Sequence, residues 1–286
     1  MKQFQWFPGH MTKALKEIQD KIKVIDVVLE LVDSRAPLAS ENPELQKIIA
    51  NKPRIRILTK KDLANSKITD EWKSYFESKG IPTLCLDLNS SNLNIINDLA
   101  KQLLQDKFIN EQKKGLKPRA IRYLIAGIPN VGKSTLINRL CKKKATIAEN
   151  RPGVTKSQQW IKINKEMELL DTPGVLWPNF EDKRIGVKLA LIGTIKNTIL
   201  PTDILFSELI KFLSENFSGL LSRHYEIEEI IVIDEQSIQK IINSIGIKRG
   251  YLLGEGKVDE NRVMSTVIKD FQNGNLGKIS LERVEK

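Results

Sequence analysis

The chain has 286 residues, 41% of them hydrophobic and 28% charged, which is typical of a folded globular protein and excludes a disordered one. No apolar run approaches the roughly 18 to 20 residues that span a bilayer, and the two distant cysteines exclude a disulfide framework. The net charge of +11 is concentrated in residues 101–156, where 14 Lys or Arg stand against three Asp or Glu, and it predicts a polyanionic partner, either a nucleic acid or nucleotide phosphates.

The first part of the chain alternates helical and strand patterns. Apolar residues at helical spacing predict helices at residues 12–23, 43–50, 70–79 and 93–107. Short β-branched or apolar runs predict strands at residues 25–33, 54–59 and 83–88. This alternation predicts right-handed βαβ units and therefore a parallel sheet.

A basic connector at residues 113–119 precedes a second set of predicted elements. These are a strand at 122–126, a helix that ends near residue 142, and paired strands at 160–164 and 167–171. After Pro178 the patterns become mostly helical, at residues 187–196, 203–215, 238–245 and 261–273. We therefore expect two domains, an α/β domain over residues 1–180 and a mostly helical domain over residues 181–286.

A phosphate-binding loop is the most specific motif in the chain. Residues 127–134, GIPNVGKS, match G-x-x-x-x-G-K-[ST] between a predicted strand and a predicted helix. The glycines let successive N–H groups turn toward phosphate oxygens, and the start of the helix adds its positive end. The phosphate contacts that we expect are Gly127, Asn130, Val131, Gly132, Lys133, Ser134 and Thr135.

A magnesium site and a sensor of the γ-phosphate are expected downstream of this loop. The Ser134 hydroxyl can bind Mg²⁺, and Asp171-Thr-Pro-Gly174 follows a predicted strand and supplies D-x-x-G. Asp171 would act on Mg²⁺ through water, and the Gly174 N–H would meet the γ-phosphate. Thr155 lies between the two motifs and is a candidate second Mg²⁺ hydroxyl. Such loops order around the γ-phosphate and loosen after hydrolysis, which makes a switch.

A candidate base-reading segment comes before the phosphate loop rather than after it. Thr59-Lys60-Lys61-Asp62 follows the predicted strand 54–59 and resembles the N-K-x-D of GTPases, with Thr59 in place of Asn. An aspartate there accepts from guanine N1–H and the 2-amino group, which adenine cannot reproduce. A second base-side loop is expected near Asp87 and Leu88, where the match to the usual S-A is poor.

The order of these motifs is that of a G protein with its two halves exchanged. On this order the chain resembles the circularly permuted GTPases, and specifically the bacterial ribosome biogenesis GTPase A family. The resemblance also rests on WFPGHM at 6–11, DSRAP at 33–37, RPGVT at 151–155, DTPGVLWP at 171–178 and the segment that begins RGYLL at 249. It implies a P-loop GTPase sheet in permuted order, followed by a mostly helical carboxyl-terminal domain.

The resemblance also implies a mechanism and partners. Val175 and Leu176 follow Gly174, so no side chain there can hold the attacking water, and we expect slow turnover alone. The family places a catalytic histidine in W-F-P-G-H, here His10, and Asn130 resembles the asparagine that coordinates K⁺ in potassium-stimulated GTPases. We expect GTP and GDP as ligands, with Mg²⁺ and K⁺ as cofactors. The expected partner is the large ribosomal subunit with its rRNA, which would stimulate hydrolysis.

Other classes of protein remain open at this point. A P-loop ATPase or nucleotide kinase shares the phosphate loop but lacks K-x-D after an earlier strand. A non-enzymatic, GTP-gated RNA-binding scaffold with incidental turnover fits the same motifs, as does a mitochondrial relative of the family. The start of the sequence, MKQFQWFPGH, has neither a signal-peptide core nor a transit-type lead, so we expect a cytoplasmic protein that is a monomer away from the ribosome.

Overall fold

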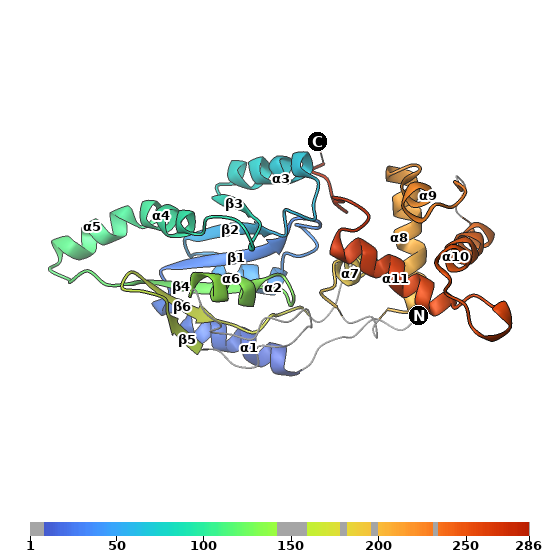
Figure 1. Cartoon of the computed structure of the whole chain (residues 1–286). Helices are drawn as coiled ribbons and strands as arrows, with labels where there is room; N and C mark the ends of the chain where they lie inside the picture. Colours follow the sequence, from blue (N-terminus) through green and yellow to red (C-terminus); the bar gives the residue numbers. More distant parts are fainter. Residues whose placement is uncertain (1–8, 142–158, 178–181, 196–199, 231–233, 286) are drawn as a thin grey trace. The chain divides into compact units, whose positions relative to one another are not determined.

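The computed structural model describes residues 9–141, 159–177, 182–195, 200–230 and 234–285 (Figure 1). The chain divides into two compact units. The first comprises Met1–Glu181 together with Ser280–Lys286, and the second comprises Asp182–Ile279. The sequence patterns assign every residue after 180 to the second domain, whereas the structure assigns the last seven residues to the first unit.

The first unit is built on a six-stranded sheet with the order β3-β2-β1-β4-β6-β5. The strands follow one another in this order from the top to the bottom of the sheet in Figure 1. Neighbouring strands are parallel except for β5, which pairs antiparallel with β6. This confirms the predicted α/β class. The strands are β1 (Val27–Asp33), β2 (Arg54–Thr59), β3 (Thr83–Leu86), β4 (Ile121–Gly127), β5 (Gln159–Lys162) and β6 (Met167–Asp171).

The central strands are buried along their lengths, as the near-continuous apolar runs predict. Every residue of β1 is buried, and so is every residue of β4 except one. Helix α3 packs Trp72 and Phe76 against Val32 and Leu58 of the sheet. The helices of this unit are α1 (Gly9–Lys21), α2 (Pro43–Ile49), α3 (Ser66–Ser78), α4 (Asn94–Leu103), α5 (Gln105–Lys113) and α6 (Lys133–Leu140), with a short 3₁₀ turn η1 (Ile22–Val24) after α1.

Several predicted elements differ from the structure at their ends: helices span Lys183–Leu191 and Glu235–Arg249 where the patterns predict residues 187–196 and 238–245. Two further differences have a local physical reason. The single helix expected over residues 93–107 is two helices, because the chain breaks at Leu104 between α4 and α5. Helix α5 has no buried residue and extends beyond the sheet (Figure 1). Strand β3 ends at Leu86 rather than at residue 88, because the Asp87 carboxylate accepts from the Asn89 N–H and begins a turn there.

The second unit is helical, as expected. Its elements are α7 (Lys183–Leu191), α8 (Thr202–Asn216), α9 (Leu220–Tyr225), α10 (Glu235–Arg249), a 3₁₀ turn η2 (Gly254–Gly256) and α11 (Glu260–Asn273). The Tyr225 hydroxyl donates to Asp270 at 2.7 Å and joins α9 to α11. The short helix α9 is not predicted by the sequence patterns. In the described parts of the chain, no helix has the length and apolar character needed to cross a membrane.

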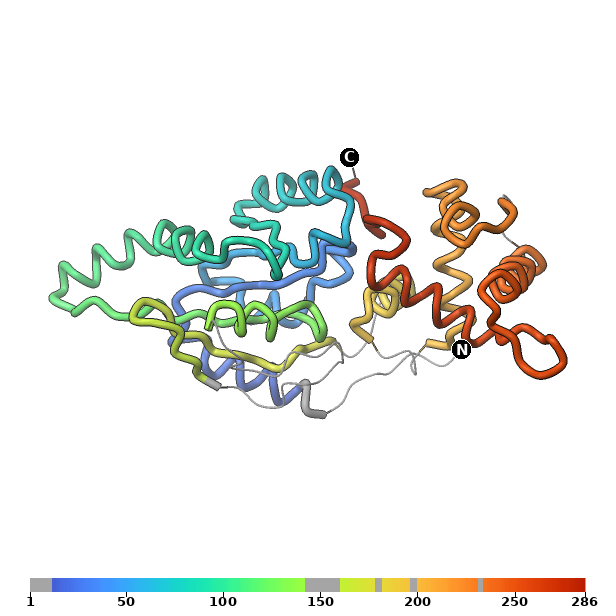
Figure 2. The backbone as a smooth tube through the Cα atoms, viewed as in Figure 1, coloured from blue at the N-terminus to red at the C-terminus, as the bar shows by residue number. Residues whose placement is uncertain are grey.

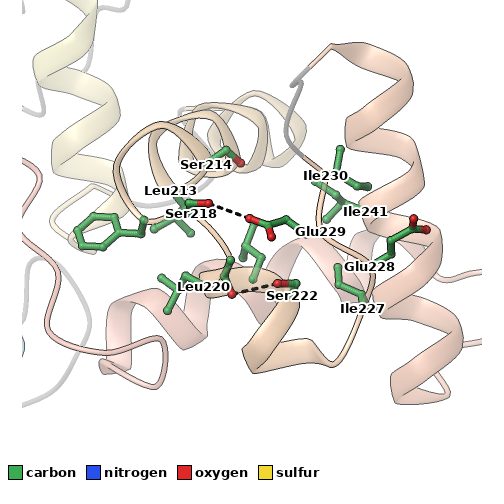
Figure 3. A pocket seen from close by; sticks show the side chains of 13 residues that line it. Leu213, Ser214, Ser218, Leu220, Ser222, Ile227, Glu228, Glu229, Ile230 and Ile241 are labelled. Carbon is green, nitrogen blue, oxygen red and sulfur yellow. Dashed lines mark hydrogen bonds between the residues drawn. The ribbon is translucent and has the colours of Figure 1, made fainter.

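A small cavity of about 50 Å³ lies within the helical unit (Figure 3). It is lined by α8, α9 and the segment that follows α9, and the Ser218 hydroxyl donates to Glu229 at its edge. None of the residues that the sequence motifs single out lines this cavity.

The carboxyl-terminal segment is part of the sheet-containing unit. Figure 2 shows the end of the chain beside α3. The Trp72 indole N–H of α3 donates to the backbone carbonyl of Glu282, and the Glu282 carboxylate accepts from the backbone N–H groups of Leu38 and Ala39. This segment is therefore fixed to the first unit by specific polar contacts.

Candidate active site

The motif residues gather at one edge of the sheet because they follow parallel strands. Thr59 ends β2, Gly127 ends β4, Asp171 ends β6, and Asp87 follows β3. The carboxyl ends of parallel strands meet at the same edge, which is where open α/β sheets bind ligands. The motifs, which occur in permuted order along the chain, therefore lie together at one site.

The phosphate loop has the tight backbone that its glycines predict. Gly127 has φ +153°, Asn130 +59° and Gly132 +105°, and α6 begins at the next residue. A Cβ on Gly127 would lie 2.6 Å from the Leu31 carbonyl oxygen of β1, so only glycine fits there. The loop therefore turns closely around the end of the sheet and leads directly into the start of a helix, which suits an anion.

Lys133 is held inside the loop. Its ammonium donates to the carbonyl oxygens of Gly127 at 3.0 Å and Ile128 at 2.8 Å. Burial lowers the pKa of Lys133, and the nearby Asp171 carboxylate opposes that effect. Ser134 and Thr135 follow in the first turn of α6, as predicted, and both are half-buried.

The Asp171 carboxylate suits a magnesium site. It is fully buried at the end of β6, and neither oxygen has a hydrogen-bond partner among the described residues. Burial raises the pKa of Asp171, and Lys133 opposes that effect. A buried carboxylate without a partner is costly, and a hydrated Mg²⁺ offers the charge and the donors that it lacks. Ser134 provides a hydroxyl oxygen of the type that Mg²⁺ binds.

The D-x-x-G loop lies directly against the phosphate loop. A Cβ on Gly174 would be 2.6 Å from Pro129 Cα and 3.0 Å from the Lys133 ammonium. The next residue, Val175, donates its N–H to the Gly127 carbonyl at 3.3 Å, and its own carbonyl accepts from the Asn42 side chain at 2.8 Å. The structure thus brings together the two motifs that the sequence separates by about forty residues. Asn42, which also caps α2, is a contact that the motifs did not predict.

Thr59 joins the base-side segment to the phosphate loop. Its hydroxyl lies 2.8 Å from the Val131 carbonyl oxygen and 3.1 Å from that of Val32. Threonine at this position therefore supplies a donor to the phosphate loop. Lys61 and Asp62 are exposed, and the Asp62 carboxylate forms no hydrogen bond or ion pair with the described residues. Asp62 is thus available to a ligand.

Lys60 is anchored by an ion pair that sequence reasoning did not assign. Its ammonium lies 3.1 Å from Asp33, which also accepts from the Arg35 guanidinium through both carboxylate oxygens at 2.9 Å. Burial alone would raise the pKa of Asp33, but the Arg35 and Lys60 charges hold it well below its usual range. Burial lowers the pKa of Lys60. Asp33 and Arg35 are part of the DSRAP segment, which supported the family resemblance but did not predict that these residues anchor Lys60.

The second predicted base loop is held in place by α6. Arg139 donates to the Leu88 carbonyl at 2.8 Å and to that of Ser91 at 3.2 Å. The Leu88 side chain meets the phosphate loop, because a Cβ on Gly132 would lie 2.8 Å from it. The Asp87 carboxylate accepts from Asn89 and Ser90 within its own turn. Arg139 belongs to no recognised motif, so the sequence did not predict this contact.

Several predicted residues lie outside the described parts. Thr155 and the lysines at 142–144 are among them. His10 belongs to the first turn of α1, but its side chain also lies outside the description. Their predicted roles stay predictions.

Comparisons with known proteins point to one family. The model of the 50S ribosome-binding GTPase family matches residues 122–243, a span that includes the phosphate loop and D-x-x-G but not residues 59–62. Ribosome biogenesis GTPase A of Bacillus licheniformis is 48% identical over 98% of both chains, and that of Bacillus pumilus is 44% identical over 98% of this chain and 99% of the other. The crystal structure of GNP-bound YlqF from T. maritima is similar with a TM-score of 0.66 at 25% identity, over 95% of this chain and 98% of that one.

Proposed function

The chain belongs to the ribosome biogenesis GTPase A family, and from this premise we propose that it is a GTP-gated assembly factor of the large (50S) ribosomal subunit that hydrolyses GTP on that particle. One observation carries the proposal: the phosphate loop, the D-x-x-G loop and the K-x-D segment meet at one edge of the sheet although they are permuted along the chain. Guanosine triphosphate offers a group to each of the three, with the β- and γ-phosphates at the first two and the guanine base at the third.

The base side reads guanine through Asp62. Its exposed carboxylate accepts from guanine N1–H and the 2-amino group, while the Lys60 stem covers the base. The turn at Asp87 and Leu88 closes the other side of the base. Competition tests this assignment: GTP displaces a fluorescent GDP analogue, and ATP does not. Displacement by ATP at similar concentrations would indicate a P-loop ATPase or nucleotide kinase instead.

The phosphate side holds the triphosphate for in-line attack. Lys133 reaches the β- and γ-phosphates from its place on the loop carbonyls, and the Gly174 N–H meets the γ-phosphate. Ser134, Asp171 and Thr155 would hold Mg²⁺, which neutralises phosphate charge. Asn130, half-buried at the bend of the loop, would hold K⁺. Faster hydrolysis in K⁺ than in Na⁺ at equal ionic strength supports the potassium assignment, and equal rates contradict it.

The protein alone turns over slowly because it lacks a water-holding side chain after D-x-x-G. Val175 and Leu176 are both apolar and buried. We propose that His10 positions the attacking water, because a neutral imidazole can accept a hydrogen bond from it. The decisive experiment measures GTP hydrolysis with and without purified large subunits for the wild type and for His10→Ala. The proposal requires stimulation of the wild type and its loss in the variant.

The large subunit is bound through exposed basic residues that contact rRNA. Lys113, Lys114 and Lys117 are exposed and form no ion pair with the described residues. Phosphate contacts of this kind make binding fall steeply with salt. Reversal of Lys113 and Lys114 to Glu, together with Lys142, Lys143 and Lys144, should weaken binding to purified subunits.

A matched control for that charge reversal lies in the β5–β6 hairpin. Lys162 and Lys165 are exposed and unpaired among the described residues, but they lie outside the basic segment 101–156. Their reversal to Glu should leave subunit binding unchanged. Binding that survives the reversal of the basic segment would overturn the rRNA assignment.

A GTP-gated scaffold with incidental turnover is the second candidate, favoured by the apolar, buried residues after Gly174. It shares one expectation with the first, that Lys133→Ala abolishes subunit binding. The two differ at His10: the scaffold predicts that His10→Ala leaves both binding and release intact, whereas the GTPase cycle predicts that release fails. We also infer a cytoplasmic protein that is a monomer away from the ribosome. Sedimentation of the purified protein tests the monomeric state.

A further inference from the structure

The guanine side of the site is supported by a segment more than 200 residues away in the sequence. The segment is Ser280–Glu282, here named the carboxyl-terminal strap. All of its contacts described below are with the sheet-containing unit. It follows α11 and so connects the helical unit back to the sheet-containing unit along the chain.

The strap contacts the Asp33–Arg35 segment on one side. The Leu281 N–H donates to the Arg35 carbonyl oxygen at 2.7 Å. The Glu282 carboxylate accepts from the N–H groups of Leu38 at 2.7 Å and Ala39 at 3.2 Å. A carboxylate on backbone N–H groups is a strong, charge-assisted contact, so the chain that follows Arg35 is held firmly.

The strap contacts the chain after the K-x-D segment on its other side. The Ser280 hydroxyl accepts from the Asn65 N–H at 3.2 Å, three residues after Asp62. Asn65 is also the N-cap of α3, and its side chain accepts from Ile68. The strap thus bridges the two stretches of chain that flank the proposed base-reading residues.

The segment that the strap holds is the one that anchors Lys60. Asp33 is buried at the end of β1 and receives both the Arg35 guanidinium and the Lys60 ammonium. Lys60 has φ +55°, in the left-handed region that costs a side-chain-bearing residue about 1 kcal/mol or more, so its conformation needs fixed partners. The chain of contacts runs from Leu281 through Arg35 and Asp33 to Lys60, and Glu282 holds the backbone just after Arg35, at Leu38 and Ala39.

We propose that the carboxyl-terminal strap is part of the guanine side of the nucleotide site: it fixes the Asp33–Arg35 pair that positions Lys60, so that strap docking and guanine nucleotide binding stabilise each other. The inference rests on the proposed function, because it assumes that Lys60 covers the base. Asp33 and Arg35 are positioning residues, since they act through Lys60. The coupling is reciprocal by thermodynamic necessity.

The first test compares two charge-neutralising variants of the same tail in the full-length chain. Glu282→Gln removes the negative charge and one of the two oxygens that accept from the Leu38 and Ala39 N–H groups, whereas Glu285→Gln removes an equal charge from an exposed residue outside the strap. Typical couplings between sites are about 5- to 150-fold, so Glu282→Gln should raise the Kd for a fluorescent GDP analogue at least about fivefold, while Glu285→Gln leaves it unchanged. The KM for GTP should rise by a similar factor with kcat unchanged, since the strap acts on binding alone.

The second test uses the wild-type protein and so does not depend on the folding of a variant. Saturating GDP should slow hydrogen exchange at the amides of Leu38, Ala39 and Leu281, because each of these N–H groups donates a hydrogen bond in the strap contacts. Exchange at the same rate with and without GDP would overturn the proposal, as would wild-type GDP affinity in folded Glu282→Gln. If the wild type itself binds no GDP, the proposed function fails instead, and the two failures are thereby distinguished.

Discussion

The hydroxyl of Thr59 lies 2.8 Å from the carbonyl oxygen of Val131 and so joins the base-side segment to the phosphate loop. GTPases commonly have asparagine at this position. A threonine hydroxyl has one proton to donate and reaches this carbonyl from the end of β2. The departure from N-K-x-D therefore preserves a link between the two halves of the site.

Replacement of Thr59 by valine tests that link. The variant keeps the shape of the side chain but leaves the buried Val131 carbonyl without its donor, which costs about 1 to 3 kcal/mol. We expect a lower free energy of unfolding in urea and a several-fold weaker GDP affinity. Thr83→Val is the control, because the Thr83 hydroxyl also bonds a backbone carbonyl, that of Ile81, away from the motif loops. It should lower stability without changing GDP affinity, and equal effects of both variants on affinity would contradict the link.

Gly174→Ala tests the approach of the D-x-x-G loop to the phosphate loop. A Cβ there would lie 2.6 Å from Pro129 Cα, so the two loops must separate. We expect kcat for GTP to fall by about tenfold or more, because misplacement of a γ-phosphate donor by an ångström has effects of that order. Steady-state kinetics provide the measurement. Gly254→Ala is the matched control, since a Cβ at Gly254 meets nothing within 4 Å, and it should leave kcat unchanged.

Arg139→Gln tests whether the loop over residues 87–91 lies against the base. The substitution removes the guanidinium that donates to the Leu88 and Ser91 carbonyls, so this loop should loosen. We expect faster dissociation of a fluorescent GDP analogue, by several-fold, in a stopped-flow chase. The control is Arg184→Gln, because Arg184 is exposed and, among the described residues, pairs only with the nearby Asp182. Unchanged dissociation in folded Arg139→Gln would remove Leu88 from the guanine site.

The buried Asp26 makes stability depend on pH. It accepts from Arg119, Lys107 and the Arg122 N–H. Burial alone would raise its pKa, but these partners lower the pKa to about 2. Because the folded pKa is lower than the unfolded value of about 3.9, this contribution of about 2 kcal/mol is present above pH 5 and is lost as the pH falls toward 2.

Asp26→Asn should therefore lower the free energy of unfolding at pH 7 by about 2 kcal/mol. The difference from the wild type should shrink as the pH falls from about 5 toward 2, which urea titrations at several pH values measure. Asp106→Asn removes an exposed carboxylate from neighbouring α5 and should have no such pH dependence. A constant difference between Asp26→Asn and the wild type over this range would contradict the assignment.

The sequence predicted the parts of the site that depend on short motifs. Strands β2 and β6 have the predicted ends, because apolar runs that stop at polar turn residues define them sharply. The contact between Gly174 and the phosphate loop follows from the convergence of parallel strand ends. The helical break at Leu104 was not predictable from periodicity, because the apolar spacing continues through it.

The parts that escaped prediction depend on contacts between distant residues. Arg139 supports the loop after β3 from α6, and Asn42 supports Val175 from the start of α2. Glu282 acts on residues more than 240 positions earlier. A local pattern carries no information on such partners. In the sequence, these three residues cannot be told apart from an arginine, asparagine or glutamate that lies on the surface without a partner.

The assignment of the last residues to the sheet-containing unit changes how the helical unit should be regarded. Residues 182–279 are an insertion with two covalent connections, not an appendage with one. The outgoing connection follows the D-x-x-G loop, and the returning one enters the strap. The helical unit is therefore tethered to the sheet-containing unit at two points of the chain, one after the D-x-x-G loop and one at the strap.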